Sequence, residues 1–180
     1  MPDAYDPPMT PLVLTILGDD RSGLVRAIAT EVTAHGGNWE RSQMAELAGK
    51  FAGIVLVSIP DERVAAFTES MVPLQGLLEV TVQRATSRTD GDGMLQWTLE
   101  ILGADRPGIV SEITTVLDHH GVNIDSLTTG TREAPMAAEM LFEAVAELEV
   151  PPTTDVAALR SDLEDLANEL MVDLDLGATD

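Results

Sequence analysis

The second half of the chain repeats the first. When the 180-residue sequence is shifted by 85 positions against itself, residues 12–42 align with residues 97–127 without a gap, and 13 of the 31 aligned pairs are identical. Chance would give about two or three identities over such a stretch, so the pattern indicates an internal duplication. A chain built in this way is expected to fold as two related domains of roughly 80 residues each.

The polar stretch between the copies sets the predicted boundaries. Residues 87–93 read SRTDGDG, and a run of Ser, Thr, Asp and Gly is typical of a linker. The sequence therefore predicts a disordered tail over 1–10, a first domain over 11–86, this linker, and a second domain over 94–177.

Charge and composition exclude several classes of function. Asp and Glu number 31 against 10 Lys and Arg, which leaves a net charge of -21. Direct nucleic-acid binding and an anionic membrane surface are excluded, because both require cationic side chains. The chain has no cysteine, so disulfides and thiolate metal sites are excluded too. We see no signal peptide or bilayer-spanning stretch, and we expect a cytoplasmic location.

Hydrophobic periodicity predicts the first two elements of the first copy. Residues 12–17 form a short apolar run ended by Gly18, which indicates a strand buried on both faces. A helix follows from Leu24, where apolar residues recur at helical spacing. Gly36 supplies a left-handed stop for this helix.

The rest of the first copy reads as a hairpin, a helix and a strand. Two strands over 39–47 and 51–59 are joined by the turn 48–50. A second helix opens at Pro60, and apolar and polar residues then alternate over 78–83, which predicts a half-exposed strand.

The second copy follows the same order. Residues 136–150 alternate between apolar and acidic side chains, a helix begins near Asp155, and residues 172–176 form a last strand. Each copy is thus strand, helix, strand, strand, helix, strand. We predict an α+β protein of two tandem ferredoxin-like domains, each with two helices on one face of a four-stranded antiparallel sheet.

The residues that both copies share gather at the turn between the first strand and the first helix. The turns span residues 18–25 and 103–110, and each places a glycine near the start of the helix, where backbone N–H groups and the helix dipole attract a carboxylate or phosphate. Pro107 suits a first helical turn. Asp20 and Asp105 either cap these helices or contact a ligand, and the chemistry leaves both roles open.

A second shared cluster follows each first helix. Asn38 and Asn123 come directly after the helix stop. An asparagine there either tolerates an unusual backbone angle or uses its amide to bind the ammonium or carboxylate of a small zwitterion. Both interpretations remain open at this stage.

Catalytic and metal-binding residues are not evident in the sequence. His35 and His120 fall at helix C-termini, where a capping role is favoured, and His119 and His120 are adjacent, so they point to different sides of a helix. Asp173 and Asp175 resemble a phosphatase aspartate pair but fit a last strand better. We find no nucleophile, base and orienting group together, so we predict no enzyme activity, cofactor or metal.

The turn sequences resemble the ACT domain, a regulatory module that binds small molecules. Gly-x-Asp-Arg-Pro-Gly-Ile-Val opens a helix in the second copy, and His-Gly-Val-Asn-Ile follows at its end. Two such units with nothing attached resemble the glycine cleavage system transcriptional regulator family. The resemblance implies βαββαβ units that pair side by side, with an amino acid bound at the interface of the pair. It places ligand contacts on Asp20, Ser22, Gly23, Leu24, Asn38, Asp105, Pro107, Gly108, Ile109 and Asn123.

The two copies also differ within these motifs. Ser22 stands where the second copy has Pro107, and Trp39 stands where it has Ile124. An indole beside Asn38 either covers a ligand or fills its place, so the two sites are expected to be unequal, or one of them to be empty.

We therefore predict a non-enzymatic sensor of a small amino acid that modulates a protein partner. By resemblance, glycine is the first candidate ligand, and the partner is a DNA-binding regulator of transcription, bound without contact to DNA. Two alternatives stay open: a ligand-free protein whose acidic faces bind a basic partner, and a regulatory subunit of an amino-acid metabolic enzyme. Exposed edge strands also favour a homodimer.

Overall fold

A computed structural model describes residues 7–86, 93–134 and 139–179. The chain divides into two compact units, Met1–Ser87 and Arg88–Asp180. The predicted linker falls almost entirely outside the described residues. The predicted tail is wrong at its end: Met9 and Thr10 already belong to the first strand, because they pair with Pro60 and Ile59 of the third strand.

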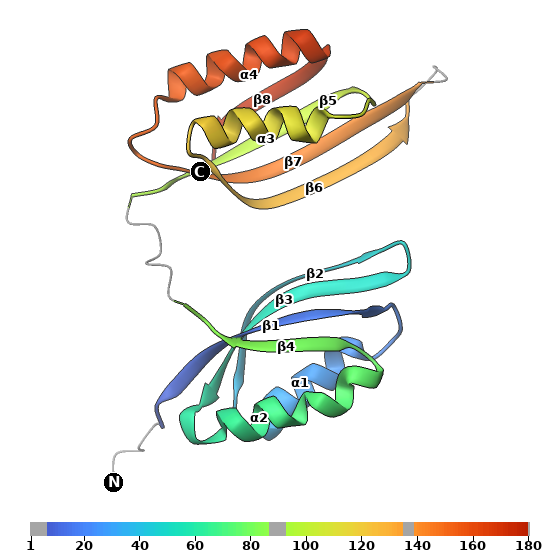
Figure 1. The fold of residues 1–180 in the computed structure, drawn as a ribbon, viewed down its shortest axis with the longest axis vertical. Coiled ribbons are helices and arrows are strands. Elements are labelled where there is room, and N and C mark those ends of the chain that lie inside the picture. The colour runs from blue at the N-terminus through green and yellow to red at the C-terminus, as the bar shows by residue number, and fades with distance from the viewer. Residues whose placement is uncertain (1–6, 87–92, 135–138, 180) are drawn as a thin grey trace. The chain divides into compact units, whose positions relative to one another are not determined.

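The first unit forms one four-stranded antiparallel sheet in the order β2-β3-β1-β4, with its helices on one side (Figure 1). Its elements are β1 (Met9–Asp19), α1 (Leu24–Ala34), β2 (Asn38–Leu47), β3 (Lys50–Pro60), the 3-10 turn η1 (Asp61–Arg63), α2 (Val64–Ser70), the 3-10 turn η2 (Val72–Gly76) and β4 (Glu79–Arg84).

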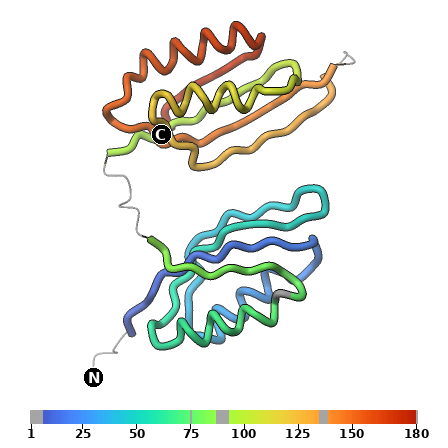
Figure 2. The backbone as a smooth tube through the Cα atoms, viewed as in Figure 1, coloured from blue at the N-terminus to red at the C-terminus, as the bar shows by residue number. Residues whose placement is uncertain are grey.

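The second unit repeats this plan with the sheet order β6-β7-β5-β8, and Figure 2 traces the same path through both units. Its elements are β5 (Leu95–Ala104), α3 (Ile109–His119), β6 (Asn123–Glu133), β7 (Met140–Val150), α4 (Val156–Leu170) and β8 (Val172–Ala178). The predicted tandem ferredoxin-like α+β fold is confirmed. Part of the strand predicted over 136–150 lies outside the described residues.

The core of each unit lies between the helices and one face of the sheet. In β1 the side chains of Leu12, Leu14 and Ile16 are buried there, while Leu17 on the opposite face is 47% exposed. The prediction of a strand buried on both faces is therefore wrong. An apolar run does not reveal how many faces are covered, and here helices cover only one.

Turn chemistry fixes the β2–β3 hairpin. Ala48 and Gly49 both have positive φ, 51° and 78°, which is the conformation of a two-residue turn whose twist matches the flanking strands. Lys50 already belongs to β3, so the turn is one residue shorter than predicted. Among the described residues, no helix is long and apolar enough to cross a lipid bilayer.

A glycine near the end of the first strand of each unit allows the chain at the start of the last strand to approach closely. A Cβ added to Gly103 would lie 2.4 Å from Val172 Cγ1 and 2.9 Å from Val172 Cα. A Cβ added to Gly18, its counterpart, would lie 2.9 Å from the Leu77 carbonyl oxygen. Because they have no Cβ, these glycines permit the close packing observed beside the shared turns.

We expect the substitution Gly103→Ala to destabilise the second unit by roughly 1–3 kcal/mol, because Val172 is packed in the core and has to shift. Gly177→Ala in β8 is the matched control, since no described atom lies within 4 Å of the Cβ added there. Urea unfolding of the full chain measures both. Equal stability of the two variants would contradict the close-approach argument.

Candidate ligand-binding turns

The helix that follows the first shared turn begins at a glycine rather than at a side-chain cap. Gly23 is the N-cap of α1 with φ 95° and ψ -1°, and no described side chain accepts a hydrogen bond from the first N–H groups of α1. At α4, by contrast, Asp155 Oδ1 accepts from the backbone nitrogens of Ala157 and Ala158 at 3.0 and 3.1 Å. The first N–H groups of α1 therefore lack a side-chain acceptor, whereas the equivalent groups of α4 are bound by Asp155.

The second shared turn has the same backbone. Gly108 is the N-cap of α3 with φ 99° and ψ -13°, again without a cap from the described side chains. Pro107 precedes this N-cap, so its predicted place in the first helical turn is wrong. Leu24 and Ile109 are buried in the cores, so only their backbone groups can meet a ligand.

The aspartates of the turns do not cap the helices. The backbone N–H of Asp20 donates to the Gly49 carbonyl oxygen at 2.9 Å, and that of Asp105 donates to the Met140 carbonyl oxygen at 2.8 Å. Their carboxylates are exposed. The capping interpretation is wrong because each aspartate lies upstream of the glycine at which its helix begins, and its backbone ties the turn to the adjacent strands.

Glu112 makes the two turns unequal, and sequence analysis missed it. Its carboxylate receives hydrogen bonds from both terminal nitrogens of Arg106, with Nη2 to Oε2 at 2.7 Å and Nη1 to Oε1 at 3.3 Å. A Cβ added to Gly108 would lie 3.1 Å from Glu112 Oε1. The first copy has Ala27 at this position, and no described atom lies within 4 Å of a Cβ added to Gly23. The first turn is therefore open, and the second carries its own carboxylate.

The two asparagines have ordinary backbone angles. In the described part of the chain, Ala48 and Met171 are the only non-glycine residues with positive φ. The left-handed residues at the helix stops are instead Gly36 and Gly121, with φ 70° and 67°. The interpretation that asparagine relieves an unusual angle is therefore wrong.

Both asparagines stand on the sheet face away from the helices. Asn38 and Asn123 are exposed at the first positions of β2 and β6. Asn123 Nδ2 donates to Glu149 Oε2 at 3.2 Å. The Asn38 amide and the Asn123 amide oxygen thus lie on that side of the sheet, where a ligand can reach them.

Within one unit, the asparagine and the turn lie at opposite ends of the sheet. Asn38 pairs with Ser58, which pairs with Pro11, whereas the turn follows Asp19. Eight residues of strand separate these levels, about 27 Å at the rise of an antiparallel strand. The second unit has the same register, because Asn123 pairs with Glu149 and Glu149 pairs with Gln96. One small ligand cannot touch both clusters of one unit, so a site that uses both requires two units.

Trp39 is part of the packing of the first unit rather than of a ligand site. It pairs with Val57 and packs against the core of the first unit, as Ile124 packs against the core of the second. Because neighbouring residues of a strand point to opposite faces, the indole and the Asn38 amide are on different sides of the sheet. The expectation that the indole covers or fills a site beside Asn38 is wrong.

The histidines cap and connect helices. His35 and His120 are the C-cap residues of α1 and α3. His35 Nδ1 lies 2.8 Å from the Glu31 carbonyl oxygen, and His120 Nε2 lies 2.7 Å from Asp162 Oδ2 on α4. No group of His, Cys, Asp or Glu among the described residues is arranged to hold a metal ion. Asp173 and Asp175 lie in β8, the predicted last strand.

An ion pair flanks the open turn. Lys50 donates to the Asp19 carboxylate and lowers the pKa of that carboxyl, and Arg21 adds a smaller lowering of the same pKa. Arg21 also donates to the Leu77 carbonyl oxygen at 3.1 Å. Because the folded-state pKa of Asp19 is below its unfolded value, its small stabilisation is complete above the unfolded-state pKa and is lost as the pH falls through the folded-state pKa.

We expect Lys50→Met to raise the pKa of Asp19 toward its ordinary value, because the main cause of the lowering is removed. Arg21→Met, which removes the lesser cause, should raise it less. NMR titration of the Asp19 carboxyl carbon measures both shifts. An unchanged titration in the Lys50 variant would rule out the ion pair in solution.

Comparisons with known proteins agree with this architecture. Two ACT-domain family models match the chain, at residues 10–83 and 97–168. The glycine cleavage system transcriptional repressor of Escherichia coli (strain K12) is 30% identical over 164 residues, which cover 88% of this chain and 85% of that protein.

Two solved structures share the fold along almost the whole chain. An unknown protein from Galdieria sulphuraria has a TM-score of 0.87 and 29% identity, covering 96% of this chain and all of that one. A putative glycine cleavage system transcriptional repressor has a TM-score of 0.67 and 19% identity, covering 95% and 98%. The duplicated βαββαβ units, the glycine turns and the relative aligned along most of its length show that this chain belongs to the ACT-domain family, as a tandem protein of the glycine cleavage system transcriptional repressor type.

Proposed function

We propose that this protein is a non-enzymatic regulator that binds a small amino acid between paired ACT units and thereby changes its affinity for a protein partner. The observation that carries the proposal is the repeated turn: in both copies the first helix begins at a left-handed glycine, and no described side chain caps its N–H groups.

The chemistry of the turn suits the carboxylate of an amino acid. Uncapped N–H groups and the positive end of the helix dipole attract an anion, and the exposed glycine lets the ligand approach the backbone. An asparagine amide from a second unit then accepts a hydrogen bond from the ligand's ammonium group. Because the two clusters of one unit lie at opposite ends of the sheet, the second unit comes from the other half of the chain or from a second chain.

Glycine is the first ligand to test. The curated relative takes its name from the glycine cleavage system, and a ligand without a side chain needs only the groups that bind its carboxylate and ammonium. By the same likeness the partner is a transcriptional regulator in the cytoplasm. The net charge of -21 supports regulation through a protein rather than through direct contact with DNA. For binding to regulate, the ligand must favour one arrangement of the paired units over another.

The proposal predicts that the full chain binds at least one amino acid, glycine first, and that Asn38→Ala and Asn123→Ala each weaken binding at one site. Loss of a hydrogen bond to a charged group should reduce affinity roughly ten- to a hundredfold. Titration calorimetry with each of the twenty amino acids makes the measurement. Gln43→Ala is the control, because Gln43 is exposed on the same strand and face as Asn38 but lies away from its end. If none of the twenty amino acids binds at millimolar concentration, the proposal is rejected.

The unequal turns give a reciprocal prediction. Glu112→Ala should strengthen binding at the second turn roughly two- to fivefold, because it removes a carboxylate that competes for the helix terminus and frees Arg106. Ala27→Glu should weaken binding at the first turn by a similar factor. The two variants exchange the residues of equivalent positions, so changes of the same sign in both would contradict the assignment of ligand to these turns.

A further inference from the structure

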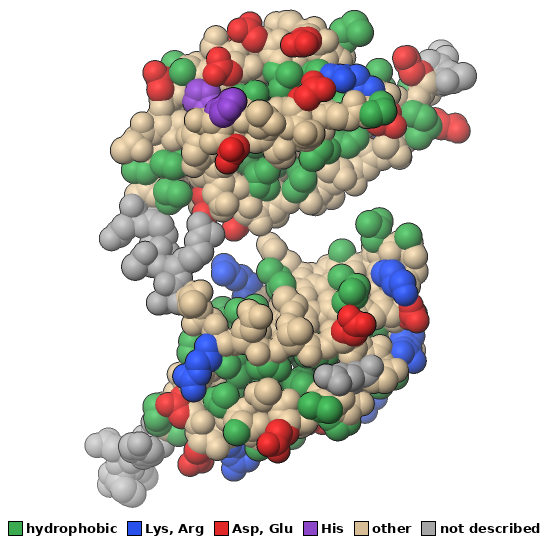
Figure 3. All heavy atoms as spheres, viewed as in Figure 1, with side chains coloured by type: hydrophobic (Ala, Val, Ile, Leu, Met, Phe, Trp, Pro, Cys, Tyr) green, Lys and Arg blue, Asp and Glu red, His purple; other side chains and the backbone are tan. Residues whose placement is uncertain are grey.

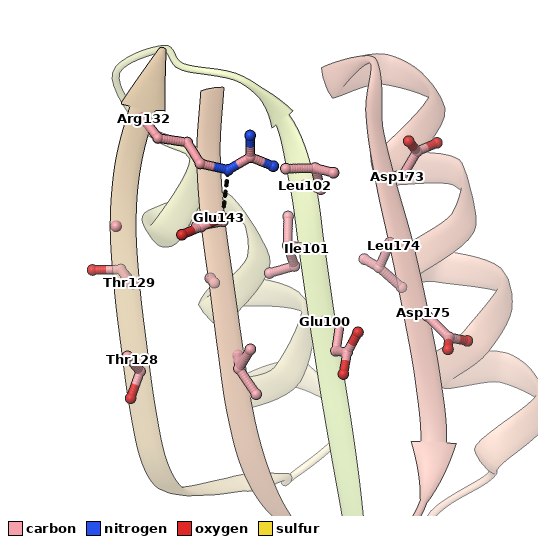
Figure 4. Close-up of a pocket in the computed structure, with 13 residues that line it drawn as sticks. Glu100, Ile101, Leu102, Thr128, Thr129, Arg132, Glu143, Asp173, Leu174 and Asp175 are labelled. Atoms are coloured by element: carbon pink, nitrogen blue, oxygen red, sulfur yellow. Dashed lines mark hydrogen bonds and ion pairs between the residues drawn. The ribbon is translucent and has the colours of Figure 1, made fainter. Parts of the chain in front are cut away.

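The face of the second sheet that the helices leave uncovered contains an open hollow of about 640 Å³. Figure 4 shows it from the side opposite the helices, with the labelled side chains on four adjacent strands. Leu102 and Val145 provide its apolar part, and carboxylates of Glu100, Asp173 and Asp175 line it. A concave surface with an apolar floor and carboxylates around it suits a side chain that combines methylene groups with a positive charge.

Two of these carboxylates face each other across the sheet. Glu100 in β5 is the register partner of Asp175 in β8, and like charges directly opposite each other destabilise a sheet. Within the described residues, Glu100, Asp173 and Asp175 have no ion-pair or hydrogen-bond partner for their carboxylates, whereas Glu143 is bound by Arg132 with Nε to Oε2 at 2.9 Å. The hollow thus already holds one arginine of the chain itself and keeps unpaired negative charge beside it.

The first unit shows that the fold does not require the opposed pair Glu100 and Asp175, although it keeps an acid, Glu79, at the position of Asp173. Thr15 and Thr81 occupy the positions of Glu100 and Asp175, are also register partners, and join their hydroxyls in a hydrogen bond. Ala52 occupies the position of Glu143, since each pairs with the equivalent leucine of the first strand. The second unit therefore has a repulsion between Glu100 and Asp175 that the first unit lacks at the same pair of positions. A cationic partner would relieve this repulsion.

We propose that the uncovered face of the second sheet, centred on Glu100 and Asp175, binds an extended segment of the protein partner that is rich in arginine or lysine. The inference rests on the proposed function for the existence of that partner and adds the surface and the chemistry of the segment. The alkyl parts of its cationic side chains lie on Leu102 and Val145, and their charged ends meet the carboxylates. The negative net charge of the whole chain attracts the segment from a distance, and Glu100 and Asp175 determine where on the surface it binds.

The test must separate this local site from general attraction, because acidic side chains are scattered over the visible surface of the second unit (Figure 3). The probe is a ten-residue peptide that alternates arginine and valine, titrated into the isotope-labelled full chain by NMR. The double variant Glu100→Thr/Asp175→Thr copies the pair of the first unit. The control Glu164→Gln/Asp165→Asn removes the same number of charges from exposed positions of α4.

We expect amide shifts concentrated in β5, β7 and β8, at least a tenfold loss of affinity in the threonine variant, and less than a twofold loss in the control. The threonine variant should also unfold at a higher urea concentration, because the opposed charges are gone. An equal loss in both variants, or shifts spread over the whole surface, would overturn the proposal in favour of diffuse charge.

The same samples separate this inference from the proposed function. Calorimetry with glycine should give the same affinity for the threonine variant as for the unchanged chain. If no amino acid binds but the threonine variant still loses affinity for the peptide, the sensor proposal is rejected and the docking-face proposal is retained. If amino acids bind and the peptide does not distinguish the two double variants, the docking face alone is rejected.

Discussion

Burial of aliphatic side chains between two helices and one face of a sheet holds each unit together, and the remaining features depend on it. The chain has only three Phe, two Trp and one Tyr, so Leu, Ile and Val provide most of the apolar area that leaves water. Leu14, Val57 and Ile28 belong to the buried core of the first unit, and Leu99, Leu148 and Leu117 belong to that of the second. Because this core needs one sheet face and the inner sides of the helices, it leaves the other face and the turns free to diverge.

The two copies have diverged in those free places. On the uncovered faces, one register pair differs in charge: the first unit has Thr15 and Thr81 where the second has Glu100 and Asp175. At the helix starts the difference has the same direction, since Ala27 leaves the first turn open and Glu112 brings a carboxylate to the second. Duplication thus preserves the packing pattern while it assigns different surface chemistry to each half.

The sequence was sufficient for the fold because strand and helix periods are local properties of the chain. The alternation up to Val150 and the helical pattern from about Asp155 predict their elements correctly. The site was harder, since its geometry depends on register: residues near each other in sequence, such as Gly23 and Asn38, lie at opposite ends of a sheet because a whole helix separates them. Comparing Glu112 with Ala27 in the aligned repeat would have indicated the unequal turns from sequence alone.

The turn proposed to bind the ligand and the proposed docking face of the second unit are physically connected through β5. The turn at Asp105 follows directly from the strand that carries Glu100 and Leu102, and its backbone is tied to Met140 at the start of β7. A ligand that pulls this turn toward a second unit therefore acts on the end of two strands that form the docking face. Such a connection transmits regulation only if the strands have two arrangements of different partner affinity, so the sensor and docking proposals together require ligand and partner to change each other's affinity by the same factor.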